Sequence, residues 1–239
     1  MRPPLSLAAG LTSLALVLAA CGQAGSSDPG SAATTAAGGA SGSSSGANCA
    51  PVPGDKLLVL QDDKMLQTVD NIIPAVSAAA ATPPLMAALN AVSAALDTPK
   101  LIELNGRIAN ERLAEADVAA EFVKQSGRTD GLEQGSGSVT VGSSTFSETA
   151  LMANIYKLAL QAAGFNASIQ SVGNRELYLP ALQSGKEIQV FPEYVGTLTE
   201  FLNVQANGKD AAPLANGDLN ATVTELTKLG DAVGLKFGE

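Results

Sequence analysis

Short apolar runs alternate with helical segments over residues 138–239, and this alternation restricts the possible fold more than any other feature of the chain. The runs SVTVG (138–142), ASIQSV (167–172) and EIQVF (187–191) have the length and composition of buried strands. The segments between them carry apolar residues at helical spacing. Strands that are separated by helices predict an α/β fold, in which a mixed, mostly parallel sheet is flanked by helices.

Local signals mark where the helices of this region begin. Thr145 and Glu148 stand three residues apart, as in a capping box that opens a helix after the first strand. Asn174 is expected to cap a helix that runs to about Ser184 and is bent at Pro180. Ligands of such sheets bind beyond the carboxyl ends of the strands. The candidate site loops are therefore residues 142–146, 173–176 and 192–197.

Residues 56–126 contain two extended segments followed by three helices. LLVL (57–60) and NIIPAV (71–76) have the apolar composition of strands. The pair Thr98-Pro99 predicts an N-cap followed by Pro at the first position of the second helix. Residues 127–137, GRTDGLEQGSG, are predicted to form a loop or linker, because glycine and polar residues dominate them.

The first fifty residues resemble an export signal followed by a tether. Residues 1–20 place one Arg before an apolar run that ends in small residues, which is typical of a secretory signal and too short for a stable membrane-spanning helix. LAAC (18–21) resembles the bacterial lipobox, so we predict a lipoprotein signal peptide over residues 1–20 and lipid modification of Cys21. An ordinary cleavable signal is the alternative. Gly, Ser, Ala and Thr dominate residues 21–50, which predicts a disordered tether.

The composition excludes several classes of function. The chain has 239 residues, of which 23 are acidic and 14 basic, so its formal net charge of −9 argues against nucleic acid as a partner. It contains no His, which removes histidine-activated nucleophiles and histidine-rich zinc sites. Cys21 and Cys49 are too few for a thiolate metal cluster, and Cys49 is either a free thiol or pairs with another chain. We therefore predict a protein that is not an enzyme and holds no metal or cofactor.

Six sequence segments resemble one protein family. VTVGSSTFSE, VGNRELYLPALQSG and VFPEYVGTLTEFL are similar to the opening half of the substrate-binding proteins of ABC transporters for glycine betaine, choline and carnitine. LLVLQDDKMLQTVDNIIPAV, ALNAVSAALDTPKLIELN and DVAAEFVKQSG resemble the closing segment of the same family. The resemblance implies a periplasmic-binding-protein-like lobe of type II.

The two groups of motifs stand in the reverse of the family's order, which implies a circular permutation. Residues 51–127 would supply the family's C-terminal segment of lobe I, residues 128–137 would join the old ends, and residues 138–239 would supply its N-terminal segment up to the hinge. Permutation costs little where the original termini lie close together at the surface. The resemblance stops where the family crosses into its second lobe, so we expect most of that lobe to be missing through truncation.

The resemblance also implies how a ligand is held. A quaternary ammonium has no proton to donate, so it is bound over aromatic rings with a carboxylate nearby. Tyr194 matches the family's aromatic position, although it could instead cap the sheet edge. Thr197 could donate its hydroxyl to a ligand carboxylate or cap a helix. Asp70 stands where some relatives carry Tyr, and Ser144 where some carry Lys. These two differences favour choline-like cations over zwitterionic betaines.

Three further residues complete the predicted ligand contacts. Thr145 follows Ser144 in the first loop, and Asn71 follows Asp70. Arg175 could bind a ligand carboxylate, although fixing the start of its helix is the alternative role.

The function implied by the resemblance is the solute-binding component of an ABC importer for quaternary ammonium osmoprotectants such as glycine betaine, choline or carnitine. The expected partners are the small ligand, the permease subunits in the membrane and a lipid anchor, and the protein is expected to be a monomer. Its expected location is the extracytoplasmic face of the bacterial cell membrane. The alternative is a truncated or degenerate surface lipoprotein with an interaction role and no transport.

Overall fold

The computed structural model describes residues 60–239 of the chain. The predicted signal peptide, the lipidation site Cys21, the tether and Cys49 lie outside these residues, as does nearly all of the expected strand at 57–60. Within residues 60–239, no helix combines the length and the hydrophobicity needed to cross a membrane.

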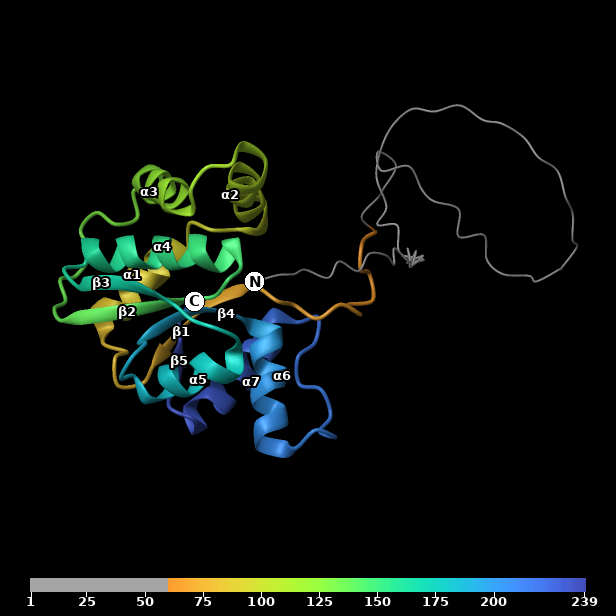
Figure 1. Cartoon of the computed structure of the whole chain (residues 1–239). Coiled ribbons are helices and arrows are strands. Elements are labelled where there is room, and N and C mark those ends of the chain that lie inside the picture. Colours follow the sequence, from red (N-terminus) through yellow and green to blue (C-terminus); the bar gives the residue numbers. More distant parts are fainter. Residues whose placement is uncertain (1–59) are drawn as a thin grey trace, which may run out of the picture. The chain divides into compact units, whose positions relative to one another are not determined.

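Five strands form one mixed sheet in the order β3-β2-β4-β1-β5 (Figure 1). β2 is parallel to β3 and to β4, whereas β1 is antiparallel to both of its neighbours, so four of the five strands run in one direction. The predicted α/β fold with a mixed, mostly parallel sheet is confirmed. The strands are β1 (Ile72–Ser77), β2 (Ser138–Ser143), β3 (Asn166–Ser171), β4 (Val190–Tyr194) and β5 (Leu235–Phe237).

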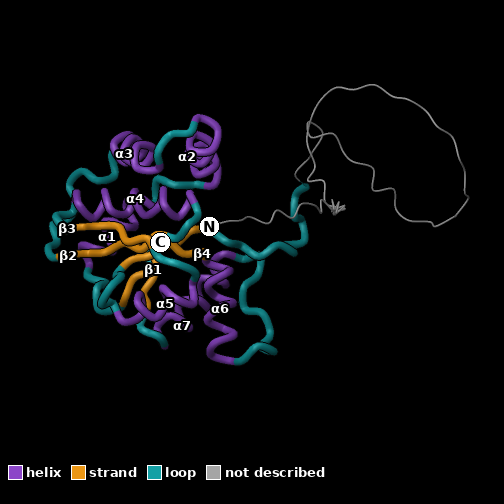
Figure 2. The backbone as a smooth tube through the Cα atoms, viewed as in Figure 1, coloured by secondary structure: helices purple, strands orange, loops and turns teal. Residues whose placement is uncertain are grey.

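Helices cover both faces of this sheet, and the sheet separates two apolar cores (Figure 2). α1 to α4 pack with β2, β3 and Val190 of β4 around one core, and α5 to α7 pack with Phe191 of β4 and with β5 around the other. Side chains of β1 alternate between them: Ile73 and Ala75 face the second core and Val76 the first. The helices are α1 (Pro83–Ser93), α2 (Thr98–Glu111), α3 (Glu115–Ser126), α4 (Ser147–Ala162), α5 (Arg175–Ser184), α6 (Val195–Asn207) and α7 (Leu219–Ala232).

Two predicted helix starts are wrong by one residue each. α2 is capped by Asp97, whose side chain accepts a hydrogen bond from the backbone N–H of Lys100 at 2.8 Å, and not by Thr98. α4 begins at Ser147, so Thr145 lies before the helix, and the predicted capping box does not form. The Glu148 carboxylate instead accepts hydrogen bonds from two distant side chains, Tyr194 and Asn105.

Other element boundaries follow the expectations more closely. Asn174 occupies the N-cap position of α5, and Pro180 lies inside that helix. No helix or strand interrupts residues 127–137, as predicted. β4 begins three residues later than the expected strand at 187–191, and β5 was not anticipated because three residues are too few to show a strand pattern.

Candidate functional site

Loops that follow β2, β3 and β4 meet around a cavity of about 590 Å³, which we call the first cavity. Parallel strands bring their carboxyl ends to one edge of a sheet, and this places the three loops together. Six of the seven predicted contacts line the first cavity, and Asn71 lines an adjoining second cavity. The six are Asp70, Ser144, Thr145, Arg175, Tyr194 and Thr197.

A fully buried carboxylate, Glu193, lies at the base of the first cavity. Arg175 donates from Nε to Oε1 at 3.0 Å and from a terminal nitrogen to Oε2 at 2.7 Å, which is a bidentate ion pair. The Tyr178 hydroxyl donates to Oε1 at 2.6 Å, and the backbone N–H of Tyr194 donates to Oε2 at 3.2 Å. The predicted contact Arg175 is therefore already paired with a carboxylate of the protein itself.

The protonation states of this cluster follow from its surroundings. Burial by itself would lower the pKa of Arg175, but the hydrogen bond and the negative charge of Glu193 outweigh it and raise the pKa. Burial and the same carboxylate raise the pKa of Tyr178 above its usual value, so its hydroxyl remains a donor. Packing also holds the two partners: the Tyr178 ring stacks on Phe191 at 3.9 Å, and the Arg175 guanidinium lies 5.6 Å from the centre of the Phe201 ring.

Asp70 caps the first turn of α6 from a position 127 residues away. Its Oδ1 accepts the backbone N–H of Thr197 at 2.9 Å, and its Oδ2 accepts the Thr197 hydroxyl at 2.5 Å. Gly196 allows this approach, because a Cβ at that position would lie 2.3 Å from the carbonyl oxygen of Val69. The helix cap therefore connects the segment before β1 to α6.

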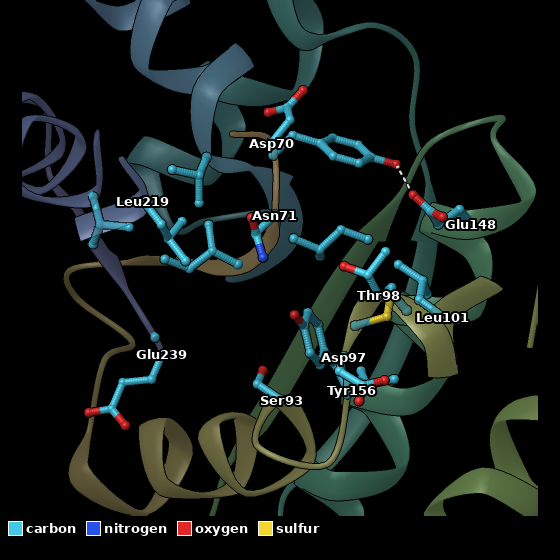
Figure 3. Close-up of a pocket in the computed structure, with 18 of the residues that line it drawn as sticks. Asp70, Asn71, Ser93, Asp97, Thr98, Leu101, Glu148, Tyr156, Leu219 and Glu239 are labelled. Atoms are coloured by element: carbon cyan, nitrogen blue, oxygen red, sulfur yellow. Dashed lines mark hydrogen bonds between the residues drawn. The ribbon is translucent and has the colours of Figure 1, made fainter. Parts of the chain in front are cut away.

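Tyr194 lines both cavities, and its hydroxyl donates to Glu148 Oε1 at 2.7 Å (Figure 3). Asn105 Nδ2 donates to the other Glu148 oxygen, so both carboxylate oxygens are engaged. Burial, the hydrogen bond to Glu148 and the negative charges of Asp70 and Glu193 raise the pKa of Tyr194. The ring therefore stays neutral at physiological pH.

The first loop is ordered by hydroxyl contacts and leaves an aromatic ring at the cavity. The Ser144 hydroxyl lies 2.6 Å from that of Thr149, which also donates to the carbonyl of Phe146 at 2.8 Å. Phe146 itself lines the first cavity and is 69% exposed. Phe146 is one of four aromatic residues that line this cavity, with Tyr178, Phe191 and Tyr194.

The charge around the first cavity favours a cation. Asp70 forms no salt bridge among residues 60–239, and neither does Glu148. Arg175 is the one basic residue of the described chain that lines this cavity, and Glu193 neutralises it. The described residues also hold no cluster of three or more metal-ligating side chains.

Sequence patterns did not predict Glu193 and Tyr178 as members of this cluster, and they predicted a capping role for Glu148. A signal for Glu193 was present: a carboxylate directly after the apolar residues Val190 and Phe191 becomes buried with its strand and requires a basic partner. The identity of that partner depends on which loop lies beside β4, and the local sequence does not specify this.

The substitution Glu193→Gln tests the buried cluster. We expect it to lower the free energy of unfolding by about 3 kcal/mol, because it leaves the partly buried Arg175 without a counter-charge. Chemical denaturation measures this change. Glu176→Gln removes an exposed carboxylate one residue from Arg175 and should change stability by less than about 0.5 kcal/mol. Equal effects of the two substitutions would contradict the assignment.

A pair of glycine substitutions tests the contact between Val69 and α6. Gly196→Ala should destabilise the protein by about 1–3 kcal/mol, because the new methyl group collides with a backbone oxygen. Gly106→Ala, inside α2, meets no atom closer than 3.7 Å and should stabilise the protein by about 0.5–1 kcal/mol through helix propensity. Thermal or chemical denaturation should therefore give opposite signs, and shifts of the same sign would refute the close contact.

A comparison with known families gives one match. The family model described as the substrate binding domain of ABC-type glycine betaine transport system matches residues 52–125 and 137–226. These two stretches make up more than half of the chain, and they include all seven predicted contact residues. No curated protein gave a significant match.

Proposed function

Since the chain belongs to the family of substrate-binding domains of ABC-type glycine betaine transport systems, we propose that it binds a quaternary ammonium osmoprotectant outside the cell membrane and delivers it to a permease. The family has a type II periplasmic-binding-protein-like fold, and its members bind their substrates without converting them. Anchoring through a lipid on Cys21 is part of this proposal.

The observation that carries the proposal is the position of Tyr194. Its neutral ring lines the first cavity together with Asp70, and Arg175 is neutralised by Glu193. An aromatic face beside an uncompensated carboxylate attracts a permanent cation, and each ring contributes about 0.5–2 kcal/mol. The exposed ring of Phe146 provides a further contact surface for the methyl groups.

We propose choline as the preferred ligand over zwitterionic betaines. A betaine carboxylate requires a donor or a free positive charge, whereas Thr197 donates its hydroxyl to Asp70 and Arg175 is held by Glu193. The carboxylate of Asp70 would also repel that of a betaine. A choline molecule carries the ammonium group without the second charge.

The circular permutation remains our proposal for the origin of the chain order. It is supported by the sheet, because β1 from the first matched stretch lies between β4 and β5. Strands from the two matched stretches, β1 and β4, therefore pair in one sheet, as expected if both belong to one lobe. Residues 126–136, between the matched stretches, include most of the loop that would join the old ends.

Binding of choline by Tyr194 variants tests the function. Tyr194→Ala should weaken choline binding roughly 2- to 30-fold, because it removes the aromatic face. Tyr194→Phe keeps that face and should stay within about threefold of the unchanged protein. Isothermal titration calorimetry with choline and with glycine betaine measures both effects.

Three results of this titration would count against the proposal. Choline affinity that is unaffected by Tyr194→Ala would exclude the proposed site. Equal affinity for choline and glycine betaine would remove the proposed preference. Failure of the unchanged protein to bind choline, glycine betaine, carnitine or proline betaine would favour an interaction role without transport.

A further inference from the structure

The second cavity, of about 630 Å³, adjoins the first and shares Asp70 and Tyr194 with it. Its size falls within the range of small-molecule sites. Glu148 also lines the second cavity, so an ammonium group beside Tyr194 would have two carboxylates near it. A ligand head at this boundary would therefore face the second cavity directly.

Most of the wall of the second cavity is apolar. It is built by side chains from the end of α1 and the start of α2, from α4, and from the starts of α6 and α7. Such a wall stabilises an alkyl chain by removing it from water. Six of its residues are Leu96, Leu101, Met152, Val195, Leu219 and Val223.

Tyr156 contributes a buried ring to this wall. The side chain is fully buried, and its hydroxyl lies beside the Ser93 side chain, which also lines the second cavity (Figure 3). Because the hydroxyl is enclosed by protein, the ring adds packing surface to the wall and not a hydrogen-bonding group that is open to a ligand.

The charged groups of the second cavity exclude one class of substituent. Asp70, Asp97, Glu148 and Glu239 line it, and no Lys or Arg of the described residues does so. A carboxylate or phosphate at the end of a ligand would meet only negative charge there. An uncharged chain meets no such penalty.

From these observations we infer that the second cavity holds an uncharged apolar chain attached to the ammonium ligand. The inference rests on the proposed function and narrows its ligand class to elongated quaternary ammonium compounds, of which acyl esters of choline are the simplest. The ammonium group lies beside Tyr194, Asp70 and Glu148, and the acyl chain packs on the wall formed by α2, α4 and α7.

A series of choline esters tests this inference on the purified full chain. The probes are choline, acetylcholine, butyrylcholine and hexanoylcholine, titrated by calorimetry. Each methylene that enters the apolar cavity should lower the dissociation constant about fourfold, until the cavity is filled. Carnitine, whose chain ends in a carboxylate, should not bind more tightly than choline.

One variant and one control locate the chain of the ligand. Leu219→Trp narrows the second cavity at a residue absent from the lining of the first, and it should abolish the gain from butyryl and hexanoyl chains. Val204→Trp places the same side chain at an exposed position of α6 outside both cavities and should preserve the gain.

The outcomes separate the two proposals. If choline binds but affinity is constant along the ester series, the inference is wrong and the proposed function stands. If the gain is present but survives Leu219→Trp, the chain does not occupy the second cavity and the inference is equally wrong. If neither choline nor any ester binds, the proposed function fails and the inference fails with it.

Discussion

The geometry of the site depends on the buried ion pair between Glu193 and Arg175. A carboxylate with no exposed surface is strongly unfavourable unless it is neutralised and fully hydrogen-bonded. Arg175, Tyr178 and the backbone of Tyr194 supply four donors to its two oxygens. Because these donors come from the start of α5 and from the junction of β4 and α6, the pair fixes two of the three loops that surround the first cavity. Arg175 is also the one basic side chain of the described residues that lines this cavity, and Glu193 neutralises its charge. The cavity is therefore suited to a cation.

Two longer-range contacts complete the site and join the two stretches of chain that match the family. Asp70 caps α6, and Glu148 of α4 links Tyr194 to Asn105 of α2. In each case a residue before position 126 contacts one after position 137 through a charged or amide side chain. The site therefore depends on both stretches, which pack on the same sheet. Tyr194 lies where these contacts converge, at the boundary between the two cavities.

The sequence predicted the sheet and the site loops because both depend on local patterns. Apolar runs that alternate with amphipathic helices predict parallel strands. The loops that follow such strands lie at one edge of the sheet. Local patterns predicted the helix starts less well. Thr145 and Glu148 have the spacing of a capping box, but the Glu148 carboxylate accepts hydrogen bonds from Tyr194 and Asn105 instead. The roles of Arg175 and Thr197 could not be read locally either, since each has several possible partners and the fold selects Glu193 for one and Asp70 for the other.

By itself the sequence determined the α/β class, the family and the set of loops that form the site, since periodicity and motif order are properties of neighbouring residues. The tertiary structure alone decided which of those polar groups are already satisfied within the protein and which remain available to a ligand. It also placed a second cavity, lined by residues from both ends of the described chain, beside Tyr194. The physical reason is that hydrogen bonds and ion pairs require their atoms to lie within a few ångströms, and residues as far apart as Asp70 and Thr197 reach that separation only when the sheet and its helices have packed.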